Sequence, residues 1–486
     1  MNFNKKLATA VSGAVLLMAG QFALADSTTD IVDALVSKGV LTEEEGKLIS
    51  KGHETKKKAE GTVGFSNGFK IKSGDGKSNF SVNGRIQADY RGFDKGQSEQ
   101  APNATIANPA ADTFDIRRAY VGAKGTFRDF INFEATVDAA GGSAYVKYFW
   151  LETAFSDAFK VRFGQFKPMF GLEQNTSSRF IDMTERDWAA SIAPGVTKGA
   201  MVHGSPYAGV NYALFVNNGS NAASPGYLAD ASQKAADSNS NGDGKQWGAN
   251  LRVNIAEILG NKEAIMHVGG SIAADDNATK GATGSLAFRT NARGTSFFVS
   301  QATLFPQTLD ITRKGLEGIG AYGPFKLQGE YTTMNFSNTG LAASDDKDIN
   351  AWYVNASYML TGESYASAYK GGLMDRMNPK ADFLGLGKPG WGAWEIGVRY
   401  SKFDAKDFDT NNAAINGATN MSSNDVHSYT AGIKWITDPN TRFMLDYVFT
   451  DFNKAITGSL ENAATSAGVT PYSNEKAVNF RAQFDF

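Results

Sequence analysis

The last nine residues of the chain alternate strictly between apolar and polar side chains, and this pattern constrains the fold more than any other feature. The apolar set is Val478, Phe480, Ala482, Phe484 and Phe486, and the polar set is Asn479, Arg481, Gln483 and Asp485. An extended strand places these two sets on opposite faces. This polarity is typical of a strand between hydrocarbon and water in a closed barrel, but a half-buried edge strand of a soluble sandwich has it too.

The same alternation recurs along the chain after Gly61. It is found in the segments 80–90, 132–138, 210–216, 247–254, 394–401, 429–435 and 442–449. Aromatic residues stand at the ends of many of the apolar sets, as in the interfacial girdles of transmembrane barrels. Because nearly every segment repeats one polarity, lipid is a simpler cover for the apolar faces than a second sheet. The pattern predicts an all-β fold, an antiparallel outer-membrane β-barrel over residues 61–486, with about 16 strands at roughly 26 residues per strand and loop.

Composition agrees with an exported barrel and excludes several other classes. The chain has 42% hydrophobic residues, 52 glycines and no cysteine, so it is too apolar for disorder and too glycine-rich for a helical protein. Without disulfides, a core or ladder hydrogen bonds must hold it together. The formal net charge of −2 indicates no strong attraction to nucleic acid.

Residues 1–25 have the pattern of a secretory signal peptide. Lys5 and Lys6 precede a short apolar run, and the run ends in Ala23-Leu24-Ala25. The run is too short and too often interrupted by small or polar residues to serve as a membrane anchor. We therefore expect export to the outer membrane with cleavage after Ala25.

Residues 26–60 are predicted to form a periplasmic helical hairpin and a tether. Thr29 can cap a helix from about Asp30 to Lys38, which Gly39 would end. Thr42 and Glu45 form a capping-box pattern for a second helix before Gly52, and residues 53–60 read as a solvated tether. Two helices of about ten residues bury too little surface to stand alone, so the hairpin should pack on the barrel, on a sister subunit or on another envelope component.

No pattern indicates an enzyme, a metal or another cofactor. The histidines, at positions 53, 203, 267 and 427, have no ligand spacing, and no serine lies in a G-x-S-x-G setting with evident partners. Residues 237–243 resemble the start of a calcium loop, but Gly248 stands where the bidentate glutamate belongs, which favours a flexible loop. A channel is the function that remains.

Residues 164–194 are the best candidate for the narrowest part of such a channel. This segment lacks alternation but carries Phe170 and Trp188 together with Lys167, Arg179 and several acidic residues. Such a composition favours a loop folded into the lumen, although an extracellular loop packed on its neighbours is the alternative.

Arg117 and Arg118 are the second candidate. In a regular strand only one of two adjacent side chains faces the lumen. Either Arg117 lies beyond the hydrocarbon, or a bulge turns it inward. Two guanidiniums at a constriction would favour anions, and their paired donors suit phosphate oxygens.

Several segments together resemble the phosphate-selective porin O and P family over nearly the whole barrel. They are Phe80–Tyr90, Arg117–Tyr120, Gly164–Glu173 with Thr176–Ser178, Tyr358–Glu363, Gly392–Ser401 and the terminal aromatic strand. The resemblance implies a trimeric, 16-stranded, anion-selective outer-membrane channel with the segment after Gly164 folded into the pore. It also implies that Arg117 and Arg118 lie at the constriction.

The basic residues are distributed differently from those of the family's phosphate-selective members. Those members carry a lysine directly after the F-G-L-E run, where this chain has Gln174, and Lys167 stands where some members have an aromatic residue. We predict that the constriction is lined by Arg117, Arg118, Lys167 and Arg179 and passes small anions, with phosphate or polyphosphate as candidates. The alternatives are a general diffusion porin and a structural protein whose hairpin anchors to the cell wall. Outer-membrane lipid and two sister copies in a homotrimer are the other expected partners.

Overall fold

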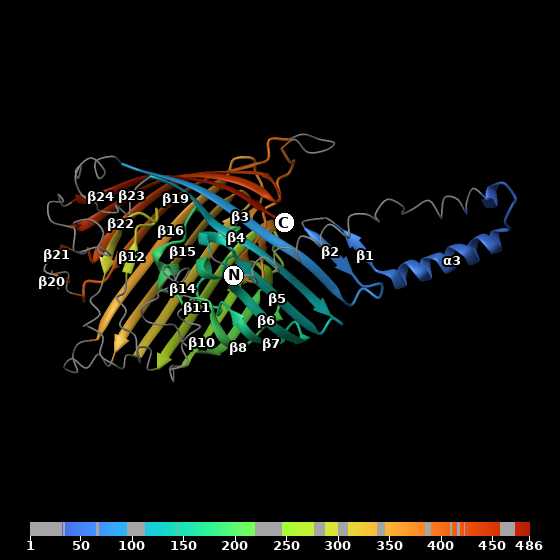
Figure 1. Ribbon diagram of the computed structural model, residues 1–486, viewed down its shortest axis with the longest axis horizontal. Helices are drawn as coiled ribbons and strands as arrows, with labels where there is room; N and C mark the ends of the chain where they lie inside the picture. Colours follow the sequence, from blue (N-terminus) through green and yellow to red (C-terminus); the bar gives the residue numbers. More distant parts are fainter. Residues whose placement is uncertain are drawn as a thin grey trace. The chain divides into compact units, whose positions relative to one another are not determined.

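The computed structural model forms a closed antiparallel β-barrel, which confirms the predicted fold class (Figure 1). The structure describes residues 32, 35–64, 68–94, 112–142, 144–218, 245–276, 287–299, 310–337, 346–383, 390–408, 411–415, 418–421, 423–456 and 472–486. The sixteen strands of the barrel are β3 (Asn79–Phe93), β4 (Thr113–Phe127), β5 (Ile131–Asp138), β6 (Tyr145–Ser156), β7 (Phe159–Phe166), β8 (Thr197–Tyr207), β9 (Val210–Asn217), β10 (Lys245–Asn254), β11 (Ala264–Asp276), β14 (Asp310–Tyr322), β15 (Phe325–Ser337), β16 (Lys347–Met359), β19 (Ala393–Asp404), β22 (Asp425–Asp438), β23 (Thr441–Ile456) and β24 (Tyr472–Asp485).

The C-terminal strand closes the barrel. β24 pairs antiparallel with β23 on one side and with β3 on the other, with Phe480 opposite Tyr90 and Arg481 opposite Asp89. Closure leaves no unpaired strand edge in the membrane, where backbone groups have no water to bind. Tight turns join neighbouring strands, as at Asp157 between β6 and β7 and at 439–440 between β22 and β23.

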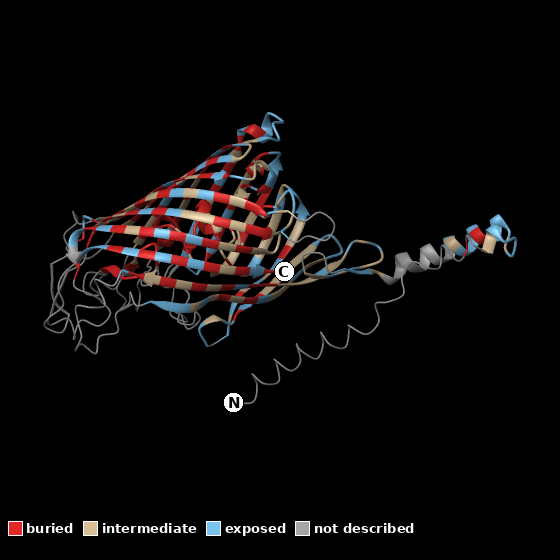
Figure 2. Cartoon of the chain, turned by 90° about the horizontal axis from the view of Figure 1, so that it is seen from above, coloured by how far each residue is buried: buried red, intermediate tan, exposed pale blue. Residues whose placement is uncertain are grey.

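Burial alternates along the strands as the sequence predicted (Figure 2). In β24, Phe480 is 40% exposed on the outer face and Arg481 is fully buried inside. Aromatic side chains gather on neighbouring strands of the outer wall, where Trp394 stacks on Trp435 with ring centroids 5.2 Å apart. Because the outer wall meets lipid and the inner wall meets water or inserted chain, both faces are satisfied.

Three segments fold into the barrel and supply its core. The lumen loop (residues 167–196) lies between β7 and β8 and contains α4 (Leu172–Asn175) and α5 (Trp188–Ile192). The lumen hairpin (residues 287–299) is built from β12 (Ala287–Arg289) and β13 (Ser296–Val299), and the insert (residues 360–383) contains η4 (Tyr365–Ala368), β17 (Tyr369–Lys370) and β18 (Leu373–Met374). The sequence predicted only the first of them.

Apolar side chains explain why these segments turn inward. The lumen hairpin contributes Phe288, Phe297 and Phe298 to a fully buried cluster with Trp188 of the lumen loop and Phe403 of β19. Trp188 and Phe297 meet edge to face with centroids 5.4 Å apart. Burial of these aromatic surfaces opposes the entropic cost of ordering the segments.

The remaining described elements are short or precede the barrel. The short elements in the connections are η2 (Ala140–Gly142), α7 (Ile255–Ile258), β20 (Asn411–Ile415) and β21 (Ala418–Met421). β1 (Thr62–Gly64), β2 (Phe69–Lys72) and α3 (Glu43–Glu60) come before the barrel. No helix in the described ranges is long and apolar enough to cross a membrane.

The second N-terminal helix, α3, agrees with the sequence at its start but not in its length. Thr42 and Glu45 form the predicted capping box, in which Glu45 N donates to Thr42 Oγ1 and Thr42 N donates to Glu45 Oε2. Gly39 has a positive φ of 69° after a helical turn, as its predicted role as a stop requires. The predicted tether at 53–60 is wrong, because α3 continues through Gly52 to Glu60, where lysine, alanine and glutamate favour helix.

Several predictions concern residues outside the described ranges. They are the signal peptide, the start of the first helix and the calcium-like segment 237–243.

Candidate functional site

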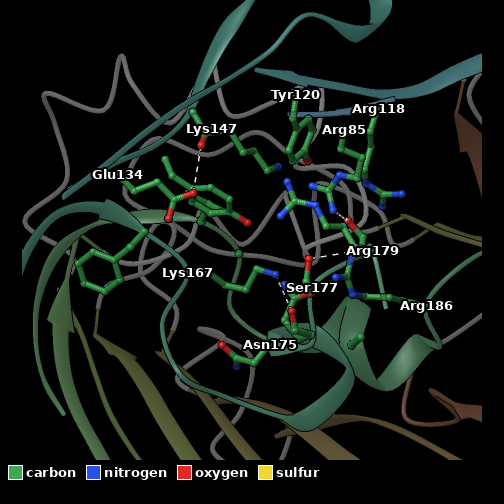
Figure 3. Close-up of a pocket in the computed structure, with 18 of the residues that line it drawn as sticks. Arg85, Arg118, Tyr120, Glu134, Lys147, Lys167, Asn175, Ser177, Arg179 and Arg186 are labelled. Atoms are coloured by element: carbon green, nitrogen blue, oxygen red, sulfur yellow. Dashed lines mark hydrogen bonds between the residues drawn. The ribbon is translucent and has the colours of Figure 1, made fainter. Parts of the chain in front are cut away.

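A cavity of about 290 Å³ lies in the lumen between β3–β7 and the lumen loop. Eight basic side chains and two acidic ones line it: Arg85, Arg117, Arg118, Lys147, Arg162, Lys167, Arg179 and Arg186, with Glu134 and Glu185. Figure 3 shows the guanidinium and ammonium groups of the labelled residues gathered around one space. The structure therefore brings together all four residues that the sequence assigned to the constriction.

Both arginines of the adjacent pair point inward. Ile116 and Val121 are about half exposed on the outer face, whereas Arg117 and Arg118 both line the lumen cavity. The alternation of β4 therefore changes phase between the two arginines, as a bulge would bring about. Of the two alternatives for Arg117, the structure shows the inward turn.

Four of the cations have only neutral hydrogen-bond partners. Arg85 Nη1 donates to Ser178 Oγ at 2.8 Å, and Arg118 Nη1 donates to Gln87 Oε1 at 2.8 Å. The other two cations donate to backbone carbonyls. Lys167 Nζ donates to the Gln174 carbonyl at 2.6 Å, and Arg186 donates to the carbonyls of Glu173 at 2.8 Å and Thr176 at 2.7 Å. In the part of the chain that the structure describes, no carboxylate oxygen lies within 4.0 Å of these four cations.

Arg117 and Arg179 have acidic partners. Arg117 Nε donates to Glu185 Oε1 at 2.8 Å, and Glu185 also accepts from Arg481 Nη2 at 3.0 Å. Arg179 Nε lies 3.7 Å from Asp485 Oδ1, and its Nη2 donates to the Gly84 carbonyl at 3.1 Å. The charges of these two arginines are thus partly compensated within the protein.

Burial and crowding by like charges affect the lysine of the lumen loop. Both burial and the nearby cations, Arg186 and Lys147 among them, lower the pKa of Lys167 well below its ordinary value. A charged Lys167 is therefore costly without a counterion. An anion bound in the cavity would offset this cost, because it stabilises the protonated form.

Aromatic rings fix two of the guanidiniums. Arg85 lies over the ring of Tyr120 at 4.2 Å, and Arg162 lies over the ring of Trp150 at 3.9 Å. Such stacking holds the guanidinium plane. Arg162 also donates to Glu152 Oε2, from Nε at 2.8 Å and from Nη2 at 2.6 Å, so its charge is compensated within the protein. Sequence reasoning gave no role to Tyr120 or Trp150, since it could not tell which strand faced which loop.

Other inward ion pairs anchor the lumen loop to the barrel wall. Glu173 accepts from Arg399 of β19 at 3.3 Å, and Asp182 accepts from Lys326 of β15 at 2.5 Å. Thr184 N donates to Asp446 of β23 at 2.6 Å. These contacts reach strands far from β7 and β8, so the prediction of a loop folded into the lumen is confirmed.

Sequence reasoning missed Lys147 and Arg186 as members of the site. Arg186 lies in the lumen loop, where no alternation indicates which side chains face the cavity, and Lys147 lies in a strand whose alternation is irregular. No cluster of three or more histidine or acidic side chains with the geometry of a metal site occurs among the described residues.

A closed sixteen-stranded barrel with a charged lumen, narrowed by inserted segments, defines the class of outer-membrane porins. The family model for phosphate-selective porin O and P matches residues 80–486, and the chain belongs to this family. Membership confirms the predicted family and describes a channel.

The chain is similar to one curated relative and to solved porin and channel structures. Porin O of Pseudomonas aeruginosa is 28% identical over 411 residues, which cover 78% of this chain and 85% of that protein. An anion-selective porin from Comamonas acidovorans is 14% identical, with 84% of this chain and all of that chain covered and a TM-score of 0.48. The outer membrane channel DcaP of Acinetobacter baumannii is 12% identical, with coverages of 85% and 99% and a TM-score of 0.44.

Proposed function

We propose that this porin is a passive channel that prefers small anions, with inorganic phosphate among its solutes, and that the lumen cavity is its selective constriction. The observation that carries the proposal is a set of four cations whose partners among the described residues are neutral: Arg85, Arg118, Lys167 and Arg186. Unpaired cations in a narrow lumen raise the local concentration of anions and repel cations.

Phosphate is favoured by the kind of donors in the cavity. Guanidiniums present paired N–H groups that match two oxygens of one oxyanion, and arginine supplies six of the eight cations. Ser177 and Ser178 also line the cavity, and hydroxyl groups can add hydrogen bonds to phosphate oxygens. The description of the family, phosphate-selective porin O and P, supports the same solute.

The test is electrophysiology of the purified protein in planar bilayers. We expect a reversal potential that indicates anion selectivity under a potassium chloride gradient, and a block of the chloride current by added phosphate. Weak selectivity without block would instead identify a general diffusion porin. Anion selectivity without block would support the anion channel and reject phosphate as a bound solute.

A second proposal concerns the N-terminal segment, for which we infer a role in assembly or anchoring. α3 exposes Leu48 and Ile49, at 76% and 43%, although an isolated helix has little reason to carry apolar residues in water. Contact with sister subunits of a homotrimer or with the cell wall would cover them. Deletion of residues 30–51 should leave single-channel conductance intact while it removes trimers or weakens envelope attachment. Unchanged assembly and attachment would reject this role.

The export route is likewise a proposal. Cleavage after Ala25 predicts a mature N-terminus at Asp26, which N-terminal sequencing of the protein from outer membranes would test.

A further inference from the structure

Glu185 is the carboxylate that the lumen loop contributes to the cavity. Its side chain is 2% exposed. Its Oε1 accepts from Arg117 Nε at 2.8 Å and from Arg481 Nη2 at 3.0 Å, and its Oε2 accepts from Arg117 Nη2 at 3.3 Å. Glu185 therefore occupies the guanidinium edge with which Arg117 would otherwise hold two oxygens of a passing oxyanion.

The position of Glu185 does not depend on Arg117 alone. The Glu185 carbonyl accepts from Arg399 Nη1 at 3.1 Å, and the preceding Thr184 is fixed to Asp446. Arg481, its second cationic partner, is itself held by a bidentate pair with Asp89 at 2.7 Å. The carboxylate would thus stay beside the cavity when a solute anion competes for Arg117.

Glu185 also stays ionised at neutral pH. Burial alone would raise the pKa of its carboxyl, but Arg117 and Arg481 outweigh burial and hold it well below its ordinary value. The cavity therefore contains one permanent internal anion on the loop side.

A channel must bind its ion strongly enough to admit it and weakly enough to release it. Four cations whose described partners are not acidic already surround the cavity. Arg117 would add another positive charge if Glu185 did not pair with it. A divalent anion would then meet a deeper electrostatic well and leave more slowly.

We propose that Glu185 is the residue that sets the anion affinity of this channel, as a built-in counterion that keeps Arg117 neutralised and so permits release. This inference rests on the proposed function, because it presupposes that anions bind in the cavity. This role predicts that loss of the Glu185 charge strengthens the block by phosphate. Loss of a residue needed only for folding would weaken the block.

The decisive variant is Glu185→Gln, which keeps the size and a hydrogen-bonding carbonyl but removes the charge. We expect the phosphate concentration that halves the chloride current to fall about tenfold. Single-channel blocks by phosphate should last longer, and phosphate flux into proteoliposomes at saturating phosphate should fall. A purely structural role would weaken the block or abolish conductance and would not lower the half-blocking concentration.

Two control variants separate charge from folding. Asp187→Asn removes a buried carboxylate from the same loop, keeps the cap on Ala189 N, and does not line the cavity, so phosphate block should match the wild type. Glu185→Asp keeps the charge on a shorter side chain, so its half-blocking concentration should fall below that of the wild type, but by no more than about threefold.

The outcomes distinguish the two proposals. If the wild type shows no phosphate block, the phosphate part of the proposed function fails and this inference fails with it. If the wild type is blocked but Glu185→Gln is blocked equally or less well, the role of Glu185 is overturned while the anion channel stands. If Glu185→Gln does not fold, Glu185→Asp decides through the blocking time, which must lengthen if the shorter side chain weakens the pair with Arg117. An unchanged or shorter blocking time in Glu185→Asp would overturn the role.

Discussion

Replacement of Arg118 by glutamine should reduce anion selectivity more clearly than any other single change in the lumen. Arg118 is 4% exposed, lines the cavity and has a glutamine side chain as its hydrogen-bond partner. Its loss therefore removes a charge without leaving a buried acid unpaired. The barrel and the anchored loop should remain as they are.

The magnitude follows from the Coulomb energy. A unit charge about 5 Å from a monovalent anion contributes about 3 kcal/mol at an effective dielectric constant of about 20. Lumen water and salt at about 0.1 M, with a Debye length of about 10 Å, reduce this to roughly half. About 1.5 kcal/mol corresponds to about a tenfold fall in the permeability ratio of chloride to potassium.

The assay is the reversal potential in planar bilayers under a potassium chloride gradient. Lys314→Gln is the matched control, because Lys314 is exposed on the outer face of β14 and its replacement changes the net charge of the chain by the same amount. We expect the control to keep the wild-type reversal potential. A permeability ratio in Arg118→Gln equal to that of the wild type, with normal conductance, would refute the assignment of the cavity as the selective constriction.

Three further predictions concern the neighbours of Arg118. Arg117→Gln should lower the unfolding free energy by about 3 kcal/mol more than Arg118→Gln, because it deprives the buried Glu185 of a partner. The measurement is thermal unfolding in detergent, and equal losses of stability in the two variants would contradict this prediction. Since burial raises the pKa of Glu173 from 4.5 to about 7, the folded protein holds a proton that the unfolded chain releases. Its contribution to stability should be full below about pH 4.5 and lost as the pH rises through 7, by about 3 kcal/mol in total, and Glu173→Gln should flatten unfolding profiles over this range. Because the pKa of Lys167 is lowered, Lys167 should lose its charge at a pH below lysine's ordinary pKa of 10.5, and anion selectivity should decline as it does. A Lys167→Met channel whose selectivity declines equally over the same pH range would contradict this cause.

The strands and their inward faces could be predicted because their signal is local. In β24 each residue's parity fixes its face, so Arg481 and Phe480 were assigned correctly without knowledge of any neighbour. The start of α3 was equally accessible, since a capping box involves residues three apart. Its end was missed because one glycine weakens a helix but does not end it.

The contents of the lumen could not be predicted in the same way. Phe288 and Phe297 carry apolar side chains that fit a lipid-facing strand as well as an inserted hairpin, and only the partner cluster around Phe403 decides. The phase change between Arg117 and Arg118 also left two readings open, since parity alone cannot place a bulge. Which cations keep acidic partners depends on contacts hundreds of residues apart, as between Glu185 and Arg481.

These long-range pairs explain how a chain with a net charge of −2 can contain a strongly cationic constriction. Acidic residues of the loop and the wall pair with cations away from the cavity: Asp182 with Lys326, Asp89 with Arg481, and Glu317 with Arg252. Such buried pairs cost desolvation and contribute little to net stability, but they fix geometry. Because the acids are bound to these anchoring cations, they neutralise the wall and leave the charges around the cavity uncompensated. Selectivity in this porin therefore depends on which cations lack acidic partners, and the total of lumen charges, which the sequence does provide, is a poor guide to it.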